Sequence, residues 1–242
     1  MNEKRELWEK RGYTTATKAL GLGAGVVLLI ALFLALFWAP SARDADTEAI
    51  LGPYHRIMYF HIPSAWVAFL AFFVVFLTSI LYLWKRTRIW DILALSSAEI
   101  GVLFATLVLL TGPIWAKAAW GIWWTWDARL TTTLILWLIY VAYLMLRSYA
   151  QEGSRGATFA AVLGIVGFLD VPLIFVSVEL WRTQHPELIV IKGGGLAPEM
   201  LRTLMIALLS FTLLYFYLLM QRVRVEGLKE RLSWLKDTLR NL

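Results

Sequence analysis

The sequence predicts an all-α protein: a polytopic membrane protein whose single domain, residues 1–242, is a bundle of six transmembrane helices. Its residues are 60% hydrophobic and only 17% charged, and the mean hydropathy is +0.66. A soluble domain of this length buries a core but keeps a more polar surface, so the apolar excess has to face lipid. Six apolar runs of about 20 residues, the length that crosses the hydrocarbon core as a helix, account for that excess.

The predicted spans follow one another with short connections. The first, residues 19–39, has an apolar run too long for a signal peptide and is interpreted as an uncleaved anchor. The second, 65–84, follows Pro63, which a helix tolerates near its first turn. The third, 92–110, is closed by a Thr-Gly-Pro sequence at 111–113. The remaining three predicted spans are residues 130–146, 157–178 and 203–220.

Six spans place both termini on one side of the membrane, and the basic residues indicate which side. Sixteen of the 23 lysines and arginines lie on the side of the termini and seven on the other. The positive-inside rule therefore predicts cytoplasmic termini in a bacterial inner membrane. The long loops, 40–64, 114–127 and 179–200, then face the periplasm. Loops positioned by a rigid scaffold usually carry function.

The tail, residues 221–242, is basic and places leucines on one helical stripe. It predicts an amphipathic cytoplasmic helix that either lies on anionic membrane lipid or packs on a partner subunit, and the lipid surface is the default expectation.

Charge and cysteine content exclude several functions. The net charge is +6, but the basic residues lie between apolar runs and at the termini, not on one recognition face, which argues against nucleic-acid binding. The chain has no cysteine, which excludes iron–sulfur clusters, thiol catalysis and covalent haem attachment through this chain. A cofactor would be held non-covalently or through other ligands.

The most unusual stretch is the tryptophan-rich segment, residues 114–127. An aromatic belt at headgroup depth is the simplest interpretation, but it explains less well four tryptophans within residues 120–126. On a short interfacial helix, Trp120, Trp123 and Trp124 would share one face. Such a platform favours a flat ligand, either a porphyrin or a quinone ring. The candidate binding residues of this segment are Trp115, Trp120, Gly121, Trp123, Trp124, Trp126 and Asp127.

All three histidines fall in the outward loops or beside them. His61 lies just before the second span and His185 just beyond the fifth, so the two flank the tryptophan-rich segment on separate loops. They are candidates for the two axial positions of a haem iron, which favours haem over a quinone. His55 is the weakest candidate, because any single histidine is as readily a hydrogen-bonded packing residue.

Two outward arginines, Arg56 and Arg129, are candidates to pair with haem propionates. Arg129 falls in the first turn of the fourth span, where the helix dipole disfavours a cation. Pairing with a propionate or with Asp127 would account for that position. Alternatively, Asp127 is the N-cap of the helix and Arg129 extends to water. The residues alone leave both interpretations open.

Residues 120–131, WGIWWTWDARLT, resemble the WWD signature of haem-handling proteins in cytochrome c biogenesis. The ending Trp-Asp-Ala-Arg-Leu-Thr is similar to the CcmC branch, whereas the CcsA branch usually has Trp-Asp-Pro-Lys-Glu there and CcmF proteins are much longer. The flanking sequences YFHIPSAW (59–66) and SVELWRTQH (177–185) also resemble the CcmC branch. The resemblance covers nearly the whole chain in length, span number and loop order.

The resemblance implies a non-enzymatic function. Such proteins bind haem b at the outer face and present it to CcmE, a periplasmic haem chaperone, beside an ABC-type complex of CcmA and CcmB with the small protein CcmD. The positions that match the family's haem site are His61 and His185 as axial ligands, with Trp120, Trp124, Trp126, Asp127, Arg56 and Arg129 around them.

Three alternatives remain. A cytochrome c haem lyase of the CcsA type is disfavoured by the short chain and by the Ala128-Arg129 ending. A permease that moves haem across the bilayer is permitted by Glu99 and Asp170 within the spans, which either pair, line a path or make a polar helix contact. Asp170 also stands where the family favours Asn. A quinone-binding subunit ranks lowest.

Overall fold

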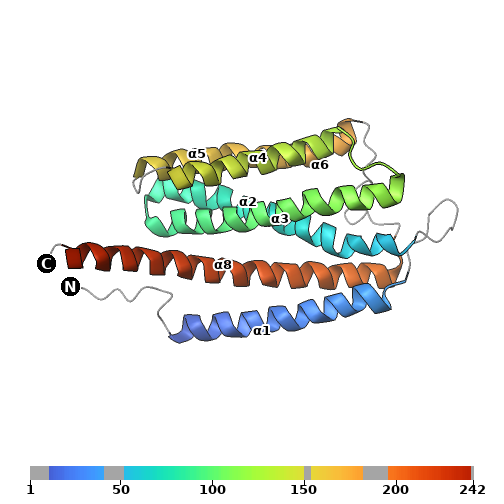
Figure 1. The fold of residues 1–242 in the computed structure, drawn as a ribbon, viewed down its shortest axis with the longest axis horizontal. Helices are drawn as coiled ribbons and strands as arrows, with labels where there is room; N and C mark the ends of the chain where they lie inside the picture. The colour runs from blue at the N-terminus through green and yellow to red at the C-terminus, as the bar shows by residue number, and fades with distance from the viewer. Residues whose placement is uncertain (1–10, 41–51, 150–153, 182–195, 241–242) are drawn as a thin grey trace.

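The computed structural model describes residues 11–40, 52–149, 154–181 and 196–240 (Figure 1). Within this described part, six helical stretches are long and apolar enough to cross a membrane, so the prediction of an all-α, six-span fold is confirmed. The helices are α1 (Arg11–Phe33), continued by a π-helical turn (Leu34–Trp38); α2 (Met58–Lys85), preceded by a 3₁₀ turn (Pro53–Ile57); α3 (Arg88–Trp120); α4 (Ala128–Tyr149); α5 (Ser154–Phe168); α6 (Asp170–Leu180); and α8 (Pro198–Arg240).

The helices run side by side along the long axis of the molecule, so the bundle has two ends (Figure 1). One end holds the start of α1, the α2–α3 connection, the end of α4, the start of α5 and the end of α8. We call it the basic end. The opposite end holds the α3–α4 connection and the starts of α2 and α8. We call it the tryptophan end.

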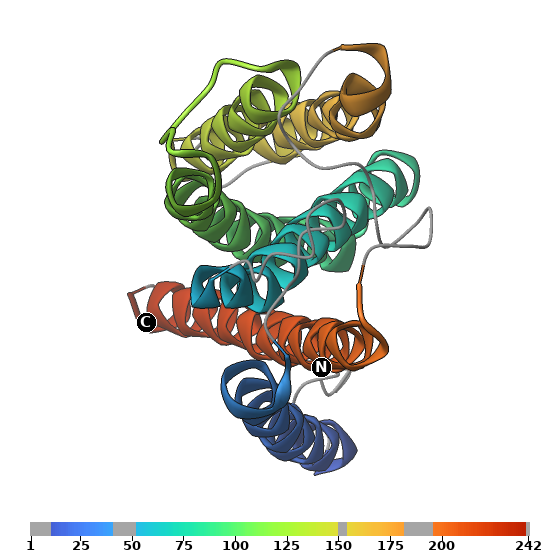
Figure 2. The same cartoon turned by 90° about the vertical axis from the view of Figure 1, so that its right-hand side faces the viewer.

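The antiparallel pair α2 and α3 forms the middle of the bundle, with α8 and then α1 on one side and α4, α5 and α6 on the other (Figure 2). In the core, the ring of Phe72 on α2 stacks on Tyr140 of α4, with centroids 3.8 Å apart. Gly101 of α3 allows this arrangement, since a Cβ there would lie 2.5 Å from Cε1 of Phe72. Lipid does not drive helices together by the hydrophobic effect, so close packing of this kind has to hold them.

Helix α1 is the outermost helix and packs mainly on α8. Its buried face consists of small residues, including Thr17, Ala24 and Ala31, which lets the two helices approach closely. The Tyr13 hydroxyl donates a hydrogen bond to the Met220 carbonyl at 2.6 Å. The opposite face of α1 is apolar and exposed, as expected of a surface that contacts lipid.

Proline has opposite outcomes in two of the predicted spans. Helix α3 continues through Pro113 to Trp120, ten residues beyond the predicted end at 110, because a spanning helix tolerates proline where neighbouring groups compensate. The fifth span is instead divided at Leu169 into α5 and α6. Pro172 causes this break, because its ring conflicts with the carbonyl four residues earlier.

Helix α8 joins the sixth span and the tail into one helix of 43 residues. It continues straight past the other helices at the basic end (Figure 1). The tail therefore continues the axis of the sixth span, and its contact with anionic lipid or with a partner subunit stays a prediction.

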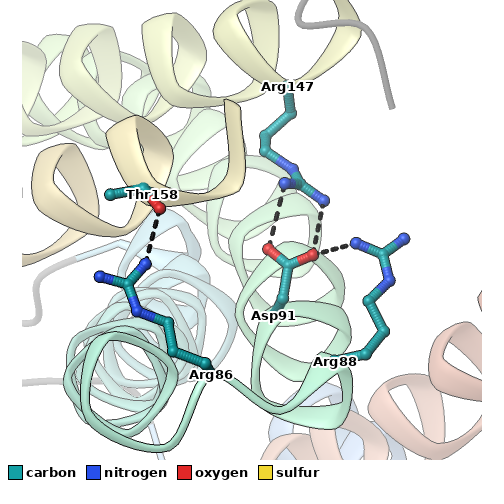
Figure 3. Close-up of polar contacts among 5 residues, drawn as sticks. All are labelled: Arg86, Arg88, Asp91, Arg147 and Thr158. Atoms are coloured by element: carbon teal, nitrogen blue, oxygen red, sulfur yellow. Dashed lines mark hydrogen bonds and ion pairs between the residues drawn. The ribbon is translucent and has the colours of Figure 1, made fainter. Parts of the chain in front are cut away.

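Ion pairs join the helices towards the basic end (Figure 3). The carboxylate of Asp91, on α3, is 3% exposed and receives both terminal nitrogens of Arg147, on α4, at 3.0 and 3.1 Å. Arg88 pairs with the same carboxylate, and Arg86 donates to the Thr158 hydroxyl of α5 at 2.8 Å. The turn between α2 and α3 is thereby held to α4 and α5.

Glu99 is also paired. Its carboxylate accepts a hydrogen bond from Arg222 of α8 at 2.6 Å, and Arg222 pairs in turn with Glu226. Glu99 is therefore an inter-helix contact between α3 and α8. Asp170 is 8% exposed, and its Oδ2 atom has no hydrogen-bond partner in the described part of the chain.

Candidate functional site

His61 lies at the tryptophan end, near the N-terminus of α2. Its side chain is buried, 8% exposed, and Nδ1 is 2.8 Å from Oγ1 of Thr111 on α3. This contact exists because α3 continues beyond residue 110, which places Thr111 on a helix that packs against α2. The ring is therefore held between two rigid helices rather than on a loop.

Trp115 contacts two histidines. Its ring centroid is 5.6 Å from that of His61 and 6.1 Å from that of His55, and both contacts are edge-to-face. Edge-to-face contacts are a favoured geometry for aromatic rings. His55 Nδ1 is buried and has no hydrogen-bond partner among the residues that the structure describes. The predicted candidates His61 and Trp115 are thus brought together.

The predicted short helix over the tryptophan-rich segment is not formed. Residues 114–120 are the last turns of α3, and residues 121–127 are an irregular connection to α4. Gly121 ends the helix, since it adopts a left-handed backbone conformation with φ of 76° and donates its N–H to the Lys117 carbonyl at 3.1 Å. Trp120, Trp123 and Trp124 therefore do not share one helix face.

The tryptophans of the connection differ in exposure. Trp126 is 75% exposed, and Trp120 and Trp123 are also exposed. Trp124 is partly buried, and its ring meets that of Trp126 edge-to-face at 5.6 Å. The buried Nε1 of Trp124 has no hydrogen-bond partner within the described ranges. A buried indole N–H usually donates a hydrogen bond to an acceptor. A ligand that places an acceptor atom beside Nε1 of Trp124 would therefore be stabilised at this position.

Asp127 is the N-cap of α4. Its Oδ1 accepts the Leu130 backbone N–H at 3.0 Å, and its Oδ2 accepts the Thr125 hydroxyl at 3.1 Å. The N-cap interpretation is therefore confirmed. Among the described residues, no ion pair joins Asp127 to Arg129. The two carboxylate oxygens of Asp127 instead accept the hydrogen bonds from Leu130 and Thr125.

Arg129 lies in the first turn of α4, and its Nη1 atom is buried. That atom has no hydrogen-bond partner among the described residues, so extension of the whole guanidinium to water does not fit. A buried cationic nitrogen without a partner favours an anionic group at this place.

Arg56 has a contact that the sequence did not predict. Its guanidinium donates to the carbonyls of Ala35 at 2.7 Å and Ala39 at 3.0 Å, and also to that of Leu36. These carbonyls end the first span and have no partner within it. Arg56 therefore fastens the end of the first span to the start of α2, and its predicted pairing with a propionate has no support in this geometry.

Sequence reasoning also missed Thr111 and Lys117. Lys117 donates to the Gly121 carbonyl at 2.9 Å and lies over the Trp123 ring, which fixes the start of the connection. Thr111 and Trp115 have the i, i+4 spacing of residues on one helix face. This spacing predicts a shared face only if the helix continues past Pro113, which the sequence did not indicate. His185 lies outside the described residues.

The fold defines this chain as a multi-pass α-helical membrane protein that gathers imidazole, indole and guanidinium groups at one end of its bundle. A family model described as CcmC, heme exporter protein C, matches residues 9–237. The chain belongs to this family, which has a role in haem handling for cytochrome c maturation.

Individual relatives agree. The chain is 36% identical to heme exporter protein C of Bradyrhizobium diazoefficiens over 217 residues, which cover 89% of this chain and 81% of the relative. It is 34% identical to the protein of the same name from Haemophilus influenzae, with 88% of each chain covered. Against that of Escherichia coli K12 the identity is 27%, over 88% of this chain and 87% of the relative.

Proposed function

We propose that this protein binds haem b non-covalently at the periplasmic face of the inner membrane and presents it to a haem chaperone of the CcmE type. The observation that carries the proposal is an imidazole fixed between two helices at the tryptophan end, near two buried N–H groups that have no hydrogen-bond partner among the described residues. His61 is the imidazole, and the donors are Nε1 of Trp124 and Nη1 of Arg129.

These residues fit the group. Haem, when bound, supplies a planar macrocycle, an iron that accepts two axial nitrogens, and two propionates. His61 would supply one ligand nitrogen to the iron, and His185 is proposed to supply the second. The aromatic surface consists of Trp115 and the tryptophans of residues 120–126. Arg129 is the better arginine for a propionate, because the guanidinium of Arg56 is already bonded to helix carbonyls.

The orientation follows from charge. Sixteen of the 23 basic residues belong to the termini and to the connections on their side, so the basic end is assigned to the cytoplasm and the tryptophan end to the periplasm. The proposed partners are CcmA and CcmB, with CcmD as a small membrane subunit. The sequence has no Gly-x-x-x-x-Gly-Lys-[Ser/Thr] phosphate loop, so ATP coupling would belong to a partner.

Haem ligation is tested by the reduced-minus-oxidised absorption spectrum of the purified protein after addition of haem. We expect the bands of a bis-imidazole haem in the wild type, and their loss or shift in His61→Ala. His55→Ala is the matched control, because His55 contacts the same Trp115 ring. A wild type without haem bands would overturn the proposal. Unchanged spectra in both His61→Ala and His185→Ala would refute the axial assignment.

Presentation is tested separately by the amount of haem recovered on a CcmE-type chaperone. Trp126→Ala should lower it, because Trp126 is the most exposed tryptophan at the tryptophan end. Trp84→Ala is the control, since Trp84 is equally exposed (76%) but lies at the other end of the bundle. Equal haem transfer in the two variants would contradict a docking role for the tryptophan-rich segment.

A haem permease is the second candidate, and Asp170 is the observation that favours it. A buried carboxyl at a break in a spanning helix is costly and often functional. Asp170→Leu, which removes the polar group, should abolish haem delivery from the cytoplasmic side if the bundle carries haem, and should leave it unchanged if the protein only presents haem. Asp170→Asn is the matched control, because it keeps a polar side chain at this position. A haem lyase would form thioether bonds on an apocytochrome without a CcmE-type chaperone, which we do not expect.

A further inference from the structure

Two hydrogen-bonding contacts of the Thr111 hydroxyl indicate which nitrogen of the His61 ring carries the proton. The Thr111 hydroxyl has a single proton and donates it to the Leu107 carbonyl at 2.7 Å. The contact of 2.8 Å between Oγ1 of Thr111 and Nδ1 of His61 therefore needs its proton from the ring. This arrangement favours His61 Nδ1 as the donor and Thr111 as the acceptor.

We propose that Thr111 is a positioning residue that holds His61 in the Nδ1–H tautomer and directs Nε2 toward the haem iron. A neutral imidazole that is protonated on Nδ1 has its lone pair on Nε2, the nitrogen that can bind a metal. A hydrogen bond from the opposite ring nitrogen sets the orientation of a ligand histidine and raises its basicity. The inference rests on the proposed function, since it assigns a role in that same site.

The same stretch of α3 also limits how the ring can turn. A Cβ at Gly112 would lie 3.3 Å from Cε1 of His61, so the ring packs closely on the helix backbone at this point. The Trp115 ring stands edge-on to His61 at 5.6 Å. Thr111, Gly112 and Trp115 therefore surround one side of the imidazole, and all three come from a single rigid helix.

The substitution that isolates this role is Thr111→Val, which keeps the shape of the side chain but removes the acceptor. Thr111→Ser restores the hydroxyl. Thr106→Val is the matched control, because Thr106 has a similar arrangement five residues earlier on α3. Its hydroxyl donates to the Val102 carbonyl at 2.7 Å and accepts the indole N–H of Trp137 at 2.8 Å.

Two measurements test the proposal. In the haem-free protein, ¹⁵N NMR of labelled histidine should show the Nδ1–H tautomer for His61 in the wild type, in Thr111→Ser and in Thr106→Val, and a mixture of tautomers in Thr111→Val. In the haem-bound protein, Thr111→Val should weaken haem binding by about 10- to 100-fold, the usual effect of losing such a partner. It should also raise the midpoint potential, because a less basic imidazole stabilises ferric iron less.

The outcomes separate the two proposals. If the wild type binds no haem, the proposed function fails, whereas the NMR result still tests the tautomer. If the wild type binds haem through His61 but Thr111→Val matches Thr106→Val in tautomer, affinity and potential, the positioning role is refuted. If Thr111→Val does not fold, the wild-type tautomer still decides, because an Nε2–H tautomer contradicts the proposal directly.

Discussion

The buried ion pair between Asp91 and Arg147 provides the clearest stability prediction (Figure 3). Side-chain exposure is 3% for Asp91 and 12% for Arg147, and an ion-pair contact of 3.0 Å and a hydrogen bond of 3.1 Å join them. Asp91→Leu leaves the guanidinium buried without a counter-charge. Loss of one partner from a buried pair costs about 3–5 kcal/mol of unfolding free energy, and we expect a loss in that range.

A double-mutant cycle separates the pair from its packing. Asp91→Leu with Arg147→Met replaces both charges by apolar side chains, and such replacements are often close to neutral, so the double variant should be nearly as stable as the wild type. Arg88→Ala is the control. Arg88 binds the same carboxylate but is 54% exposed, so its loss should cost only about 0–1 kcal/mol.

The assay is reversible unfolding in mixed micelles of increasing SDS content, followed by circular dichroism. The reasoning is refuted if Asp91→Leu costs no more than Arg88→Ala. It is also refuted if the double variant is as unstable as the two single variants combined, because the charges would then be independent.

Three further predictions concern single residues. Arg129→Gln should weaken haem binding in a spectroscopic titration without a change in band positions, because a propionate partner acts on affinity and not on the iron, and a shifted band would contradict this assignment. Arg56→Gln should lower the unfolding free energy by about 1.5–3 kcal/mol, as expected for the loss of hydrogen bonds from a charged group. An unchanged SDS midpoint would show that the contact of Arg56 with the carbonyls at the end of the first span does not stabilise the protein. Gly101→Ala should lower it by about 1–3 kcal/mol through the clash with Phe72, whereas Gly25→Ala, whose added Cβ would meet no atom within 4 Å, should not destabilise the helix.

The six spans were predictable because each one is specified by its own residues. In lipid every backbone polar group has to be satisfied within the segment, so an apolar run of about 20 residues forms a helix whatever its neighbours are. The alternating order of basic and outward loops follows from the same runs. Within the described chain, hydropathy therefore predicted the fold class.

Helix ends were harder to predict. Pro113 suggested that the third span ended at 110, but the helix continues to Trp120, whereas Pro172 does divide the fifth span. Both prolines lack a backbone N–H and conflict with the carbonyl four residues earlier, so the residue itself does not explain the different outcomes. Whether a helix continues past a proline depends on groups from neighbouring helices, which a local pattern does not contain.

The candidate site shows the same division. The side chains suited to haem, including His61, Trp124 and Arg129, were recognisable from residue type, loop position and the family signature. Their partners were not. Thr111 lies 50 residues from His61, and Arg56 lies 21 residues from the carbonyl of Ala35 that it binds. Such contacts exist only after the helices pack, because packing decides which groups from distant segments come within hydrogen-bonding distance and which buried donors are left to bind a ligand.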